Sequence, residues 1–290
     1  MNINDITSGP VASPAELIDL QESLQLPQPA MNPVPLAFRG QSKSYGTLVP
    51  SFQRIFGQKR WVGAAQIIER DLIKTFRKHY ATLQGRTSDM PSPHAIDEGY
   101  DLRCLSVMQH YGVPTRLLDW TSHFWTAVYF ACAGDPATEA ELWWYGRDIF
   151  FEQAGARPDL ASLLQPSLGN QPILPPREPD LLSERGGSLI AELDPQITPR
   201  MRQQYAHHTL SSDVFADHAP LLFDMAQTAR STGGANGIFH RLLIAPGCKE
   251  KALRFLEEQK QCTAGTIFPD VEGLGRFLHW HLESLLTTLL

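Results

Sequence analysis

The sequence lacks long apolar runs, is poor in cysteine, and contains no glycine-rich phosphate loop and no serine flanked by glycines as a nucleophile elbow. A membrane-spanning helix needs about 20 mostly apolar residues, so we expect no membrane partner. The first residues, MNINDITSGP, lack the basic and apolar regions of a signal peptide. We therefore expect a cytoplasmic protein.

The cysteines and histidines give no metal-binding pattern. None of the four cysteines forms a closely spaced pair, which predicts reduced, buried thiols: Cys104, Cys132, Cys248 and Cys262. His207 and His208 are adjacent in a candidate strand, where neighbouring side chains point to opposite faces. His279 and His281 are two apart on a candidate helix and also face apart. No metal cofactor is expected.

The net charge of −6 argues against broad binding to a nucleic-acid backbone, which requires a positive face. One anionic ligand remains compatible with it. The 290 residues are enough for one large domain or two small ones. Residues 1–32 read as a helical arm over 13–26 followed by a proline-rich connector, because Ser13 and Pro14 are typical helix starts.

The rest of the chain predicts an α+β fold, since helices come early and strands are irregularly spaced. Apolar periodicity predicts helices at 62–83, 100–110, 121–134, 249–259 and 273–290. Strands are predicted at 36–39, 141–146, 188–194 and 237–246, with a short strand or turn at 115–120. Residues 85–99 and the proline-rich 153–187 are predicted to be loops, and 200–213 is ambiguous.

The stretch LAFRGQSKSYGTLVPSF, residues 36–52, places Arg39 and Gly40 at the end of a candidate strand. A guanidinium group pairs bidentately with phosphate or carboxylate, and a glycine lets a ligand approach the backbone. Two interpretations stay open. The pair seats an anionic ligand, or Arg39 forms a salt bridge at the strand end and Gly40 begins a turn.

The second polar stretch, HYGVPTRLLDWT, leads into the helix predicted at 121–134, with Thr121 or Ser122 as its cap. A polar, aromatic-rich turn before a helix N-terminus can form a ligand wall. The alternative is that Asp119 and Thr121 only cap the helix, Arg116 pairs with Asp119, and Trp120 is part of the core.

The motifs FRGQS, LVPSF, HYGVPTRLLDWT, AVYFA and TIFPDVEGL resemble the FRG-domain proteins, which are named for a Phe/Tyr-Arg-Gly motif. The resemblance runs from about residue 36 to 277, so residues 33–290 are identified as an FRG domain. The motif order also resembles, more distantly, the arginine-type ADP-ribosyltransferases. That resemblance implies an ADP-ribosyltransferase-like split β-sheet core with flanking helices.

The more distant resemblance implies roles for particular residues. Arg39 would contact the phosphates or the nicotinamide ribose of NAD, Gly40 would hold the nicotinamide amide, and Asp119 or Thr121 would orient the site. Trp120 or Tyr111 would stack on the nicotinamide. The remaining residues assigned to the NAD-binding wall on this resemblance are His110 and Arg116.

The third element of the transferase pattern is an acidic residue on a later strand, and here the sequence departs from it. The corresponding stretch, RMRQQ, places Gln204 at that position, and a neutral amide cannot offset positive charge. Glu192 is a rival with the right charge.

The leading hypothesis is an NAD-binding, ADP-ribosyltransferase-like enzyme that transfers ADP-ribose to an unknown acceptor or hydrolyses NAD. The alternative is a non-catalytic module that binds a nucleotide or a protein. A third hypothesis is a toxin or phage-defence effector that a regulatory partner protein triggers.

Overall fold

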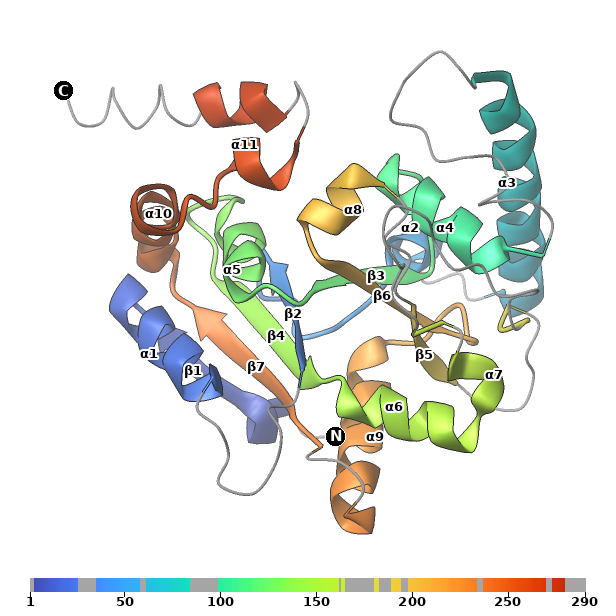
Figure 1. Ribbon diagram of the computed structural model, residues 1–290, viewed down its shortest axis with the longest axis horizontal. Coiled ribbons are helices and arrows are strands. Elements are labelled where there is room, and N and C mark those ends of the chain that lie inside the picture. Colours follow the sequence, from blue (N-terminus) through green and yellow to red (C-terminus); the bar gives the residue numbers. More distant parts are fainter. Residues whose placement is uncertain are drawn as a thin grey trace.

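The protein is built on one seven-stranded mixed sheet with helices on both faces (Figure 1). The computed structural model describes residues 3–25, 35–57, 61–83, 99–161, 163–164, 180–182, 189–193, 198–233, 237–269 and 273–279. In spatial order the strands are β1 (Thr7–Val11), β7 (Phe239–Ile244), β4 (Ala140–Gly146), β2 (Leu36–Gln41), β3 (Leu117–Thr121), β6 (Ala206–Ser211) and β5 (Ile190–Leu193). Only β1 and β7 run parallel among these neighbouring pairs.

The helices fall on both faces because the strands alternate apolar side chains between two packed cores. They are η1 (Ile3–Ile6), α1 (Pro14–Gln25), α2 (Ser51–Phe56), α3 (Val62–Leu83), α4 (Asp101–His110), α5 (Phe124–Cys132), α6 (Asp148–Ala156), α7 (Pro158–Ala161), α8 (Pro199–Gln203), α9 (His218–Thr232), α10 (Pro246–Phe255), the π-helical η3 (Leu256–Lys260) and α11 (Ala264–Ile267). Residues 273–279 are also helical. The mixed α and β content confirms the α+β class.

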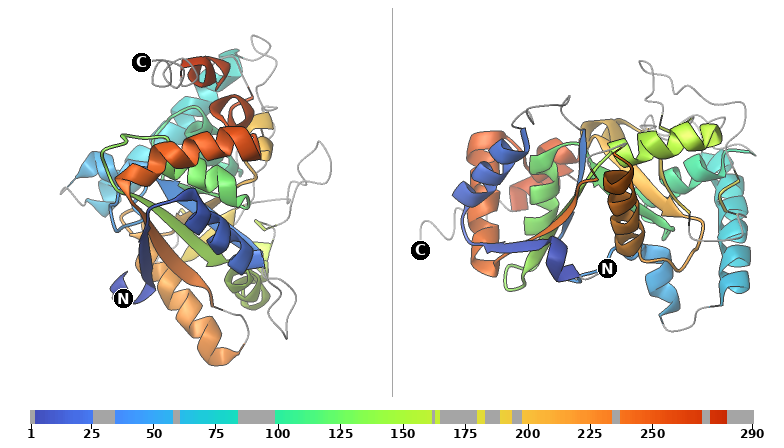
Figure 2. Two further views of the ribbon diagram at one scale, coloured as in Figure 1. Left: turned by 90° about the vertical axis from the view of Figure 1, so that its left-hand side faces the viewer. Right: turned by 90° about the horizontal axis from the view of Figure 1, so that it is seen from below.

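Four apolar clusters occur among the described residues, and three of them hold these layers together. The first packs α1, α5 and α10 on β2, β4 and β7, and the second packs α3 and α4 on β3, β5 and β6. The third joins α6 and α9 to the opposite face (Figure 2). Phe38, Leu118, Trp120 and Ala127 are all buried in these clusters, and Phe130 packs on the first while partly exposed.

The shortest strand pairing in the sheet is the one between β2 and β3. They share a single register pair, Phe38 with Thr121, whereas β2 and β4 share six pairs and β3 and β6 share five. Beyond that pair the two strands no longer bond to each other, and the polar residues of both motifs lie where they part. This divergence positions the site described below.

The N-terminal segment takes a larger part in the fold than an arm would. The expected helix is present as α1, but residues 7–11 also form edge strand β1, which pairs with β7. The sequence TSGPV lacks the apolar alternation that signals a strand, so this element was not expected. The connector predicted to follow α1 lies mostly outside the described residues.

Further expectations need correction. The loop predicted at 153–187 begins inside α6, continues into α7, and otherwise lies largely outside the described residues, as does the loop predicted at 85–99. The ambiguous 200–213 resolves into α8 and β6, and α9 was not expected. Helix α5 is capped by His123, whose ring accepts the Thr126 amide, and not by Thr121 or Ser122.

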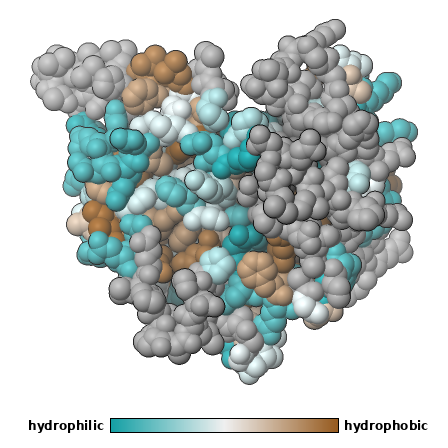
Figure 3. All heavy atoms as spheres, viewed as in Figure 1, coloured by the Kyte–Doolittle hydropathy of each residue, from teal (hydrophilic) through white to brown (hydrophobic). Residues whose placement is uncertain are grey.

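None of the four cysteines forms a disulfide bond and all four are buried, as the sequence predicts. Among the described helices, none is long and apolar enough to cross a membrane. The face in Figure 3 mixes hydrophilic and hydrophobic residues in small groups.

Candidate functional site

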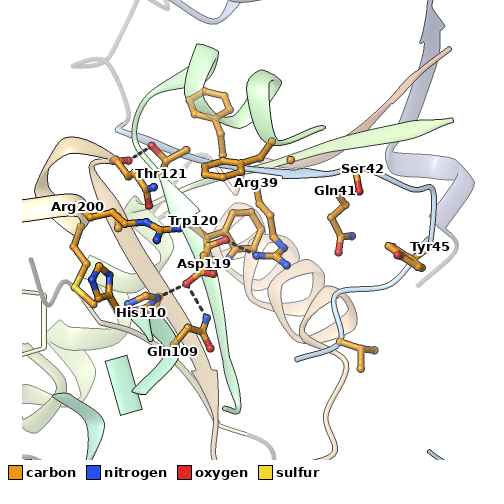
Figure 4. Close-up of a pocket in the computed structure, with 18 of the residues that line it drawn as sticks. Arg39, Gln41, Ser42, Tyr45, Gln109, His110, Asp119, Trp120, Thr121 and Arg200 are labelled. Atoms are coloured by element: carbon orange, nitrogen blue, oxygen red, sulfur yellow. Dashed lines mark hydrogen bonds and ion pairs between the residues drawn. The ribbon is translucent and has the colours of Figure 1, made fainter. Parts of the chain in front are cut away.

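A pocket of about 450 Å³ opens where β2 and β3 diverge. This volume lies in the range of small-molecule sites. Its described walls come from β2 and the loop after it, β3, β6, α2, α4, α5 and α8 (Figure 4). Most of the residues singled out in the sequence line it: Arg39, Gly40, His110, Asp119, Trp120, Thr121 and Gln204. The two motifs therefore meet at one site.

Arg39 enters the pocket from β2 and is only partly satisfied by the protein. Its Nη1 donates to the backbone carbonyl of Asp119 at 2.7 Å, as drawn in Figure 4. Its Nε is buried and has no hydrogen-bond partner among the described residues. Burial lowers the pKa of the guanidinium group, and the nearby Asp119 carboxylate opposes that shift. Since a buried donor is normally paired, an open Nε is where a ligand oxygen would bind.

Asp119 presents a carboxylate to the same space. Its side chain is 60% exposed, Gln109 donates to Oδ1 at 2.7 Å, and Nδ1 of His208 lies 3.0 Å from the same oxygen. Desolvation by the surrounding protein acts to raise the pKa of this carboxyl group, but contacts with His208, Arg39 and Gln109 lower it to about 2. The described walls of the pocket therefore carry one fixed negative charge at neutral pH.

Thr121 and Gln204 are bonded to each other and to the surrounding backbone. The Thr121 hydroxyl donates to the Gln204 carbonyl at 2.6 Å, and the Gln204 side chain donates to the Ile267 carbonyl at 3.2 Å. The amide of Gln204 is thus tied to α11, and it carries no charge.

Gly40 is required for packing as well as for the pocket. A Cβ built there would lie 2.0 Å from the Ala127 carbonyl oxygen and 2.5 Å from the Ala131 amide nitrogen, both backbone atoms of α5. Only glycine lets the strand pass the helix at this distance.

Trp120 and Tyr111 do not take the places implied for them as binding residues. The Trp120 indole donates to Thr209 and packs edge-on against Tyr145, in the core shared with α9, although the residue borders the pocket. Tyr111 is not among the described pocket residues; its ring lies beside Tyr80 and His110. Successive side chains of a strand point to opposite faces, so Trp120 points away from the face of Asp119 and Thr121. This alternation could have predicted the core position of Trp120 from the sequence.

Arg116 is part of the buried structure and does not pair with Asp119. It forms a buried ion pair with Glu69 of α3, and its Nη1 donates to the carbonyls of Ser211 and Ser212, each at 3.1 Å. It does not line the pocket as described. The rival acid Glu192 is also elsewhere, buried in β5 and bonded to Tyr145 and Arg147.

Sequence reasoning missed several residues of the pocket. Arg54 and Arg200 line it with Arg39, so its described walls carry three arginines against the one carboxylate of Asp119. Tyr45, Gln109 and His208 were also not assigned. An excess of positive charge in a small cleft favours an anionic ligand.

No group of three or more His, Cys, Asp or Glu side chains suited to a metal ion occurs within the described ranges. The charged and imidazole groups on the described walls of the pocket come from arginine, aspartate and histidine side chains.

Residues 35–140 match the FRG domain family. The matched stretch contains β2, the loop after it, β3 and α5, and so both motifs of the pocket. It ends before Gln204, which follows α8, and before His208 of β6. No curated protein and no solved structure matches the chain.

Proposed function

We propose that the pocket binds NAD and that the protein cleaves its nicotinamide–ribose bond, passing ADP-ribose to an acceptor or to water. The observation that carries the proposal is the pairing of opposite charges in one cleft. Arg39 offers an open donor, and 60% exposed Asp119 offers an ionised carboxylate.

Binding would depend on the arginines. A diphosphate oxygen at Arg39 Nε would satisfy the unpartnered donor, and charge-assisted contacts of this kind are the strong ones. Arg54 and Arg200 add positive charge on the walls. Arg54 is itself anchored, since its Nη1 donates to the Val49 carbonyl at 2.5 Å.

Cleavage would depend on Asp119. As the C1′–N bond breaks, its electron pair moves to the nicotinamide ring, and positive charge develops on the ribose carbon and ring oxygen. A fixed carboxylate near that charge stabilises the transition state more than the ground state. Asp119 would thus supply the negative charge that Gln204 cannot, while Gln204 fixes the position of Thr121 through its carbonyl group.

The experiment measures nicotinamide release from NAD by the full chain. Asp119→Asn keeps the shape of the side chain and removes its charge, and we expect the rate to fall about a hundredfold, the order seen when one electrostatic stabiliser is lost. Arg39→Ala should weaken NAD binding. Matched controls are Asp159→Asn and Arg157→Ala, because these residues form an ion pair exposed at the surface and outside the described pocket.

Two outcomes would contradict the proposal. Nicotinamide release at the same rate in wild type and Asp119→Asn would remove the carboxylate from the mechanism. NAD binding that needs Arg39, without any nicotinamide release, would favour the non-catalytic nucleotide-binding module.

A further inference from the structure

Tyr45 is the exposed aromatic ring of the pocket. It lies on the loop after β2, lines the cleft, and is 60% exposed. Within the part of the chain that the structure describes, its ring packs on no other aromatic ring and its hydroxyl group has no hydrogen-bond partner. Figure 4 shows Tyr45 and Arg200 on opposite sides of Arg39 and Asp119.

The backbone that carries Tyr45 is held by the buried carboxylate of Glu141 on β4. Oε1 of Glu141 accepts hydrogen bonds from the Tyr45 amide at 3.1 Å and from the Gln41 side chain at 2.6 Å. Oε2 accepts from the Gly46 amide at 3.2 Å and from Arg241 Nε at 2.6 Å. The fully buried Glu141 side chain therefore fixes the backbone of both Tyr45 and Gly46.

The rest of the loop is anchored on both sides of Tyr45. The Ser44 amide donates to the Glu139 carbonyl at 2.9 Å, and the Leu48 amide donates to Asp217 Oδ1 at 2.8 Å. The Leu48 carbonyl accepts the His218 amide at 3.0 Å. A loop with this many bonds loses little conformational freedom when a ligand binds, which favours affinity.

Exposed aromatic residues are common, and exposure alone indicates nothing about a ligand. Trp61, for example, is 69% exposed and does not line the described pocket. Tyr45 differs because its backbone is fixed and because it shares a cleft with three arginines. An aromatic face beside positive charge is the combination that binds a planar base attached to phosphate.

We propose that Tyr45 stacks on a base of the nucleotide whose phosphates Arg39 holds, and that Glu141 is the positioning residue for Tyr45. The inference rests on the proposed function for the identity of the nucleotide. Adenine and nicotinamide are both planar rings, so the shared chemistry is a heterocyclic base, and the experiment separates the two.

The experiment measures binding of ADP-ribose, nicotinamide mononucleotide and inorganic pyrophosphate to the full chain by calorimetry. Tyr45→Ala should weaken binding of the base-containing probe about tenfold, the order expected for a lost stacking contact, and leave pyrophosphate binding unchanged. The probe that is affected identifies the base. Tyr45→Phe should retain affinity, and Trp61→Ala is the matched control for removal of an exposed aromatic ring.

Glu141→Gln tests the positioning role. Glu141→Gln should weaken binding of the same base-containing probe and leave pyrophosphate binding unchanged. In the double variant it should add little to the loss of affinity caused by Tyr45→Ala, because both changes remove the same stacking contact. A purely structural role would weaken all probes alike and add fully to Tyr45→Ala. The melting temperature of each variant is measured in parallel.

The two proposals can fail separately. If Tyr45→Ala leaves every probe unaffected, or weakens all three equally, the stacking inference is overturned, and nicotinamide release by wild type still supports the proposed function. If the base-selective loss appears without nicotinamide release, stacking is supported and the reaction is not. Failure of all three probes to bind the wild-type chain overturns both.

Discussion

Arg39 and Arg116 belong to the two motifs that drew attention in the sequence, yet the protein surrounds them very differently. Arg116 is buried against Glu69 and two backbone carbonyls. Arg39 has one backbone carbonyl as acceptor and a buried Nε with no described partner. A guanidinium group whose donors are met by the fold stabilises the fold, whereas one with an open donor beside a pocket is available to a ligand.

The difference follows from where β2 and β3 part. Arg116 precedes β3 on the side covered by α3, so that a carboxylate from that helix reaches it. Arg39 points into the space left when β2 and β3 stop pairing after Phe38 and Thr121. The same residue type thus has a structural role on one side of the divergence and a candidate binding role within it.

The largest expected effect tests the structural half of this comparison. Arg116→Ala leaves the Glu69 carboxylate buried without its partner, and breaking such a pair costs about 3–5 kcal/mol of the free energy of unfolding. Urea denaturation followed by circular dichroism measures it. Arg254→Ala, which removes an exposed ion pair with Glu250, is the control and should cost less than about 1 kcal/mol. An equal, small loss in both variants would contradict a structural role for Arg116.

Much of the fold was predictable because local patterns decided it. The helix expected at 62–83 has the same bounds in the structure, since its apolar periodicity is long and unbroken. The periodicity alone does not give its buried face, however: the apolar Ile68 is exposed, while the charged Glu69 is buried. The burial of Glu69 goes with its ion pair to Arg116, which lies 47 positions away, and no local pattern reports such a partner.

The candidate site was predictable to the same extent. Arg39, Asp119 and Thr121 line one pocket because they lie on β2 and β3 where these neighbouring strands diverge, whereas Tyr111, expected to join them, is not among the described pocket residues. The surroundings of Arg116 were not predictable, because they depend on long-range packing. Tyr45 was overlooked because its loop gains its shape from Glu141, a buried acid on a strand whose sequence otherwise reads as apolar.

The second effect tests the ligand-binding half. Arg39→Lys keeps the charge and loses the planar fork, so NAD or ADP-ribose should bind about ten- to a hundredfold more weakly, equivalent to roughly 1.5–3 kcal/mol. The unfolding free energy should change by less than about 1 kcal/mol, because among the described residues the Arg39 side chain makes one hydrogen bond, to a backbone carbonyl. Calorimetry and urea denaturation on the same preparations give both quantities. A large stability loss with unchanged affinity would make Arg39 a structural residue like Arg116.

The smallest expected effect concerns His218, because the charges of both arginines lower its pKa. Burial, together with the charges of Arg39 and Arg116, lowers the pKa of His218 to about 3, and the ring stays neutral, with Nδ1 3.0 Å from the Thr209 hydroxyl oxygen. In the unfolded chain the pKa is about 6.5, so the unfolded state binds the proton first as pH falls. The contribution of His218 to folding stability is therefore largest above about pH 6.5 and decreases toward pH 3, with about 2 kcal/mol lost through this residue between pH 7 and pH 5.

His218→Gln removes the titrating group and should flatten that part of the pH profile by the same amount, as measured by urea denaturation at each pH. Because burial is the larger cause, Arg39→Ala should leave most of the slope in place. An unchanged slope in His218→Gln would mean that the ring binds its proton equally in the folded and unfolded states, and that burial and the two guanidinium groups do not lower its pKa.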